Sequence, residues 1–124
     1  MAEKYSYPRR AVRVNLEWDG PAIAKENAAK ARIALFRAMG DIITEANKIV
    51  PHDTGDLMRS GHHQASADLV GTVSYGDVDV PYAGRLHEHP EYHFQQGREG
   101  KWLEKTINES GPRIMDWLKK ELSF

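Results

Sequence analysis

One pattern constrains the fold more than any other: apolar residues recur at spacings of three and four over residues 21–50. This spacing places them on one stripe of a long helix, which has to cover a sheet or another helix. Pro51 disfavours helical geometry at Val50, so we expect the helix to end there. Gly40 indicates either a close crossing or a break. The stripe comprises Ala24, Ala28, Ala31, Leu35, Met39, Ile42, Ala46 and Ile49.

Short strand patterns flank this helix on both sides. Before it, apolar residues alternate with polar ones from Val12 to Trp18, which is the period-two signature of a half-buried strand. After the loop 51–56, residues 57–67 and 69–75 predict two strands joined by a tight turn near Asp68. Residues 77–80 predict a short additional strand, and residues 82–87 predict one or two helical turns.

A second amphipathic helix is predicted from about Lys101 to the end of the chain. The tripeptide at 110–112, Ser-Gly-Pro, interrupts it either as a kink or as the cap of a new segment. This order of elements predicts an α+β fold, in which a small antiparallel sheet packs against a long N-terminal helix and a C-terminal helix. We expect a flexible arm over residues 1–10 and a single domain over 11–124. The shared face of the last helix comprises Leu103, Ile107, Ile114, Leu118 and Leu122.

Composition excludes several classes of protein. The chain has 124 residues, a net charge of -1 and no cysteine. The near-neutral charge argues against a dedicated nucleic-acid binder, and the lack of cysteine excludes disulfides and thiolate metal sites. No apolar run approaches the roughly twenty residues of a membrane span, and the N-terminus leads into polar residues. We expect a soluble protein that is made in the cytoplasm.

The run from Val50 to Ser60 contains Asp53-Thr54-Gly55, which is also the active-site tripeptide of aspartic proteases. Such an enzyme pairs its Asp with a second carboxylate across a twofold axis. Here the tripeptide follows the end of a helix, and no second motif of that kind occurs downstream. We interpret Asp53 or Thr54 as a cap for local N–H groups and Gly55 as a turn residue. A dimeric protease acting through Asp53 is the third of our hypotheses.

Histidines cluster between residues 87 and 93. His87, His89 and His93 lie beside two carboxylates in seven residues, a combination that suits zinc or another divalent transition metal. Pro90 breaks any helix that would align the last two, so surface or subunit contacts are the simpler interpretation, and we expect no metal. The chain also lacks a phosphate-binding glycine loop and a nucleophile motif. We therefore expect no catalytic residue, no cofactor and no enzymatic activity.

Three segments together resemble the head–tail joining, or tail-completion, proteins of long-tailed bacteriophages, which are often called minor capsid proteins. They are residues 50–60 (VPHDTGDLMRS), 81–88 (PYAGRLHE) and 101–106 (KWLEKT). Their order and spacing both fit, and the resemblance covers roughly residues 20–122. In many relatives an acidic residue stands where His87 does, whereas here the acid is Glu88. The residues that carry the motifs are Pro51, Thr54, Gly55, Leu57, Tyr82, Ala83, Trp102 and Leu103.

The resemblance implies a structural protein of the virion without catalysis. Copies would be made in the host cytoplasm and would assemble as a homo-oligomeric ring, sixfold, at the neck where the head meets the tail. The partners implied are other copies of the chain and the neighbouring neck proteins, namely a head-side adaptor or stopper and the tail terminator. DNA would cross the channel without specific binding, and no membrane is involved.

A ring requires a head-to-tail interface that closes on itself. The alanine-lined half of the helix at 21–50, the long connection at 89–100 and the arm at 1–10 have no evident internal use, so we expect them to contact other subunits and the neighbouring rings. The residues expected at subunit contacts are Ala24, Ala28, Ala31, Tyr92 and Phe94. The alternative hypothesis is a small cytoplasmic metal- or ligand-binding protein that uses the loop His87–His93.

Overall fold

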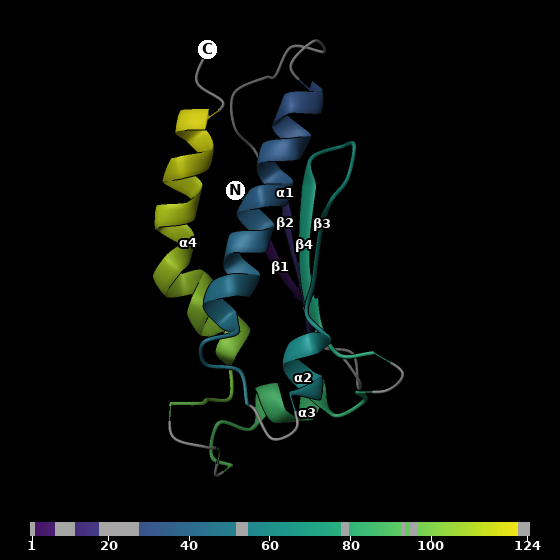
Figure 1. Cartoon of the computed structure of the whole chain (residues 1–124), viewed down its shortest axis with the longest axis vertical. Coiled ribbons are helices and arrows are strands. Elements are labelled where there is room, and N and C mark those ends of the chain that lie inside the picture. The colour runs from purple at the N-terminus through teal and green to yellow at the C-terminus, as the bar shows by residue number, and fades with distance from the viewer. Residues whose placement is uncertain are drawn as a thin grey trace.

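The computed structural model describes residues 2–6, 12–17, 28–51, 55–77, 80–92, 94 and 97–121, with the backbone alone at 2–6 and 17. It confirms the predicted α+β class. An antiparallel sheet packs against helix α1 (Ala28–Ala46) and helix α4 (Trp102–Glu121). The two helices run side by side, as Figure 1 shows. The helix predicted over residues 21–50 ends earlier than expected, because α1 ends at Ala46, and residues 21–27 lie outside the described part of the chain.

The sheet is built around β2 (Val12–Glu17), β4 (Val70–Tyr75) and β3 (His62–Ala65), which pair in this order and are all antiparallel. The strand β1 (Ala2–Ser6) pairs antiparallel with the outer side of β2. The flexible arm expected over residues 1–10 is therefore wrong for 2–6, because pairing with β2 gives these residues a hydrogen-bonding partner. Residues 7–10 lie outside the described part of the chain.

Alternation along the strands separates an apolar face from a polar face. Val14, Val73 and Tyr75 are buried beneath the helices. On the opposite face Thr72 donates a side-chain hydrogen bond to Asn15 Oδ1 at 3.0 Å. The sheet is therefore covered by helices on one face, while its other face carries polar side chains of intermediate or full exposure among the described residues.

The predicted stripe of α1 contributes to the core, together with residues of the sheet and of α4. Its described members up to Ala46 are buried except for the half-buried Ala28. Gly40 marks a close crossing and not a break, because a Cβ at that position would lie 3.1 Å from Nε2 of His63. After Ala46 the chain tightens into turns, in which the N–H of Lys48 bonds Glu45 O at 3.2 Å and the N–H of Ile49 bonds Ala46 O at 3.0 Å.

Three further expectations need correction. Residues 56–59 form the one-turn helix α2 (Asp56–Arg59), so the strand predicted over 57–67 is limited to β3. The helix α4 continues through Pro112 without a cap or a second segment, since Pro112 is exposed and the carbonyl whose partner it removes is that of the exposed Asn108. The strand expected over 77–80 is not formed at Asp77 or Val80, and its middle lies outside the described residues.

The tight turn near Asp68 and the short helix after it are confirmed. The N–H of Ser66 bonds Val70 O at 2.9 Å, and the Ser66 hydroxyl bonds the carboxylate of Asp68. This hydrogen bond holds the pKa of Asp68 below its usual value. Helix α3 (Ala83–Glu88) covers the residues predicted to form one or two helical turns.

Candidate functional site

The three segments that resemble the phage family meet at one end of the molecule. Figure 1 shows α2, α3 and the first turn of α4 together at this end, below the sheet and α1. Trp102 is at their centre and is completely buried. Its ring contacts those of Tyr75 (centroids 5.8 Å apart) and His87 (4.8 Å), each nearly edge-on. We call this cluster of Tyr75, His87 and Trp102 with the segments around it the junction.

The described part of the segment from Pro51 to Ser60 lies between α1 and the junction (Figure 1). Gly55 has φ 87°, a left-handed conformation that glycine adopts without steric cost. Leu57 is buried, and the Ser60 hydroxyl donates to Leu57 O at 2.6 Å while accepting the N–H of Gly76 at 2.9 Å. Ser60 therefore ties the end of α2 to the end of β4. Asp53 and Thr54 lie outside the described residues.

A second set of bonds ties α3 to the start of α4. The N–H of Lys101 bonds His87 O at 2.7 Å, and its ammonium bonds Glu88 Oε2 at 2.8 Å. Gly100 comes directly before this contact, and a Cβ there would lie 2.7 Å from Cα of Pro90, which is closer than real Cβ contacts come. The chain therefore needs glycine at this position so that the loop can close against α3.

The ionisation of the junction fits a structural role. Burial lowers the pKa of His87 despite the opposing effect of Glu88, so the imidazole is neutral at pH 7. Burial raises the pKa of Glu88, but the hydrogen bonds from Lys101 and His87 outweigh this and leave it below the usual value. Burial also raises the pKa of Tyr75, whose hydroxyl donates to Asn47 Oδ1 at 2.6 Å. Packing holds the neutral ring of His87, and hydrogen bonds hold the carboxylate of Glu88.

The structure separates the histidines proposed as metal ligands. His87 is buried against Trp102, whereas the ring of His89 stacks on Tyr92 at 4.7 Å and bonds Glu91 at 2.7 Å. That bond holds the pKa of Glu91 below its usual value. His93 lies outside the described residues, and within the described ranges no three histidine, aspartate or glutamate side chains gather as a metal site would require.

The connection at 89–100 is tied to the body of the domain in its described parts. The N–H of Glu99 bonds Ile49 O at 2.8 Å, and the Arg98 guanidinium bonds the carbonyls of Asn47 and Val50. The Lys105 ammonium pairs with Glu99 at 2.6 Å, which raises the pKa of Lys105. These bonds leave a pocket of about 370 Å³, lined by Pro90, Tyr92, Phe94, Arg98, Glu99, Gly100, Lys101 and Lys105.

The residues expected at subunit contacts differ in how deeply the structure buries them. Ala31 is buried in the chain's own core, so it is not available to another subunit, and this expectation is wrong. Ala28 is half-buried, and Ala24 lies outside the described residues. Tyr92 is exposed over 40 % of its surface, and Phe94 is half-buried beside it at a ring distance of 6.5 Å.

A groove between α1 and β3 was missed by the sequence reasoning. Ile33 and Phe36 are 58 % and 46 % exposed, although both are large and apolar. The signal was present, because both residues lie on α1 but outside its predicted stripe. The groove has a volume of about 590 Å³ and is lined by Ala28, Ala29, Arg32, Ile33, Phe36, Gln64, Ala65 and Ala67.

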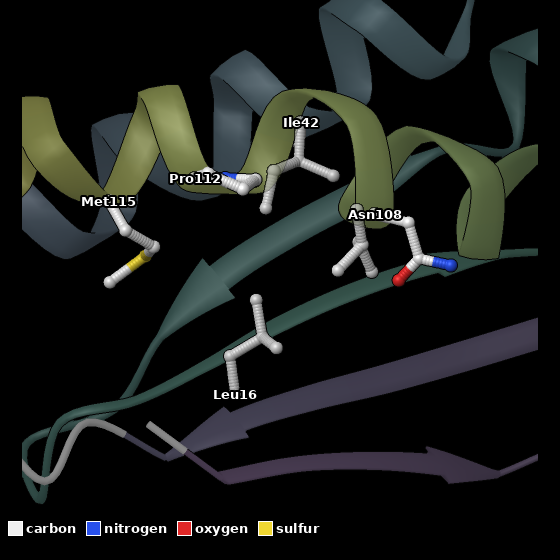
Figure 2. A pocket seen from close by; sticks show the side chains of 7 residues that line it. Leu16, Ile42, Asn108, Pro112 and Met115 are labelled. Carbon is white, nitrogen blue, oxygen red and sulfur yellow. The ribbon is translucent and has the colours of Figure 1, made fainter.

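A smaller apolar pocket of about 230 Å³ opens between the two long helices and the sheet. Figure 2 shows Asn108, Pro112 and Met115 of α4 together with Ile42 of α1 on the side of the pocket opposite Leu16 of β2. The pocket has room for a small apolar group, such as one side chain.

No family model, curated protein or solved structure gives a significant match to the chain. Among the described residues no helix combines the length and the apolar character that crossing a bilayer requires. Function is therefore inferred from the residues and from their arrangement.

Proposed function

We propose that this chain is a structural protein of a tailed-phage virion, which forms a ring at the head–tail junction through which DNA passes. One observation carries the proposal. The segments 50–60, 81–88 and 101–106 are distant in sequence, yet they lie at one end of the domain (Figure 1), where His87 packs on Trp102, Lys101 bonds His87 O and Ser60 bonds the end of β4. A set of motifs that meets in a packed junction is what a shared scaffold requires.

The burial of the motif residues supports a role in the scaffold and not in catalysis. Leu57, Ala83, Trp102 and Leu103 are buried. The charged groups nearest to them are paired, Glu88 with Lys101 and Asp56 with Arg59. These residues position elements, and the functional surfaces of such a protein lie elsewhere on the domain.

The shape of the domain also suits a ring. A closed ring with one kind of subunit requires two different surfaces on each copy, one complementary to the other. The sheet has two different edges, at β1 and β3, and one polar face. The ring is proposed to be sixfold and to contact a head-side adaptor or stopper and a tail terminator. A net charge of -1 suits a channel, because a strongly basic lining would retain DNA through its phosphates.

Two experiments test this function. The purified chain is expected to have a mass close to six times that of one subunit in light scattering after gel filtration. Phage particles that lack the protein are expected to accumulate as separate filled heads and tails under the electron microscope. Particles that join normally without the protein would overturn the assignment to the neck.

A further inference from the structure

The edge strand β3 presents backbone groups that can accept another strand. In an antiparallel ladder, hydrogen-bonded residue pairs alternate with pairs that are not hydrogen-bonded. The bond from Ser66 N to Val70 O makes Ser66 and Val70 a hydrogen-bonded pair, so His63 and Ala65 direct their backbone groups away from β4. Arg32 Nε donates to Ala65 O at 2.9 Å, which agrees with this direction, and an incoming strand would take the place of Arg32 at this carbonyl. In the described sheet, β3 is one of the two edge strands and pairs with β4 on one side.

The surface beside this edge is apolar. Ile33 and Phe36 are two of the three large apolar side chains that the described part of the chain exposes, and both line the groove next to β3. The ring of Phe36 lies 4.5 Å from that of His63, so the groove continues into the strand. The strand itself, with the sequence HHQA, contains none of the lysines, prolines or acidic residues that protect the edges of natural sheets. The edge is suited to pairing.

The charges around the groove select the kind of partner. The first ten residues of α1 carry Lys30, Arg32 and Arg37 and no acidic residue. Two copies that met groove to groove across a twofold axis would bring these cations together. The opposite edge of the sheet, β1, has the sequence AEKYS, in which one acid balances one base. Charge therefore favours contact between β3 and β1 over contact between two β3 edges.

Strand direction leads to the same pairing. Because all neighbours in the order β1-β2-β4-β3 are antiparallel, β1 and β3 run in opposite directions. Rotation about an axis along the strands preserves these directions, so β3 of one copy meets β1 of the next as an antiparallel pair. The lengths are also similar, with four residues in β3 and five in β1.

We propose that the β3 edge, together with Ile33 and Phe36, accepts strand β1 of a second copy of this chain, so that the sheets of neighbouring subunits join. This interface rests on the proposed ring, and it names the two surfaces that such a ring requires. It also gives a register. Lys4, Asn15, Thr72 and Gln64 are successive cross-strand partners in one row of the sheet. In a closed ring whose strands run along its axis, Gln64 of one copy meets Lys4 of the next.

The absence of cysteine from the chain allows a direct test by cross-linking. Lys4→Cys and Gln64→Cys are prepared as separate proteins, mixed and oxidised, and disulfide-linked pairs are measured on a non-reducing gel. The mixture is expected to form linked pairs that contain one copy of each variant. Gln64→Cys mixed with Lys119→Cys is the control, since Lys119 is exposed on α4. Efficient linking of Gln64→Cys to itself would show a twofold contact and would overturn the proposal.

Assembly gives the second test. Phe36→Glu places a charge in the groove at an exposed site, so the subunit is expected to keep its fold by circular dichroism while its mass falls to that of one chain. Thr44→Glu is the matched control, because Thr44 is exposed on the same helix outside the groove and the change in charge is the same. Rings that form equally well with Phe36→Glu would refute this interface and leave the ring itself intact. A wild-type chain that stays monomeric would refute the ring, and the interface with it.

Discussion

Replacing Trp102 by alanine tests the junction most directly. The side chain is completely buried and contacts two aromatic rings, so its removal leaves a cavity that the surrounding helices and sheet fill poorly. Truncation of a buried tryptophan costs about 4 kcal/mol. Domains of this size are stable by about 5–15 kcal/mol, so the variant loses a large part of its stability. At about 4 °C for each kcal/mol, the melting temperature falls by about 15 °C.

Thermal unfolding followed by circular dichroism measures this loss, with Trp117→Ala as the reference. Trp117 is half-buried on the same helix, so its truncation removes less apolar contact and costs about 1–2 kcal/mol. A double-mutant cycle between Trp102 and His87 is expected to give a coupling energy of about 0.5–1.5 kcal/mol. The reasoning is refuted if Trp102→Ala lowers the melting temperature no more than Trp117→Ala does.

Two further predictions concern the same fold. Gly100→Ala is expected to destabilise the protein by about 2–3 kcal/mol, because the added methyl meets the backbone of Pro90. Gly71→Ala is expected to cost about 1 kcal/mol, because the flexible end of Met39 can move away. Urea titration of both variants gives the order of the two losses, and equal losses would contradict the prediction. Because the folded pKa of His87 lies below its unfolded value, the unfolded state binds more protons, so stability decreases as the pH falls below about 6.5. His87→Gln is expected to flatten this part of the stability profile, and an unchanged slope would exclude His87 as its cause.

Long, periodic elements of this fold could be predicted from the sequence. The stripe predicted over residues 21–50 is specified by eight positions at helical spacing, and the burial of its members from Ala31 to Ala46 follows directly from that pattern. The strand β4 and its turn at Asp68 were also predictable, since alternation and a Ser-Ala-Asp turn are both local signals. The close crossing at Gly40 was one of two alternatives that spacing could not separate, because it depends on the ring of His63 from another element.

Short elements, and elements that depend on tertiary contacts, could not be predicted from the periodicity of the sequence. Helix α2 has four residues, which is little more than one helical turn and too short to show a helical period, so Leu57 and Met58 fit a strand equally well. Residues 2–6 form strand β1 by pairing with β2, and nothing in the sequence of residues 1–10 specifies that partner. The continuity of α4 through Pro112 depends on where the missing hydrogen bond falls, which is the exposed side of the helix. Each of these outcomes is decided by contacts and not by local propensity.

The junction and the groove lie at different ends of the domain, and this separation bears on how the protein can be tested. Figure 1 places α2 and α3 at one end, whereas the first turns of α1 and the turn between β3 and β4, which border the groove, lie toward the other. Substitutions at Trp102 act on a buried cluster and therefore change stability, while substitutions at Phe36 act on an exposed ring and change assembly. Sites this far apart with no shared contacts have nearly additive effects. A variant that combines both changes should therefore show the melting temperature of the first and the mass of the second.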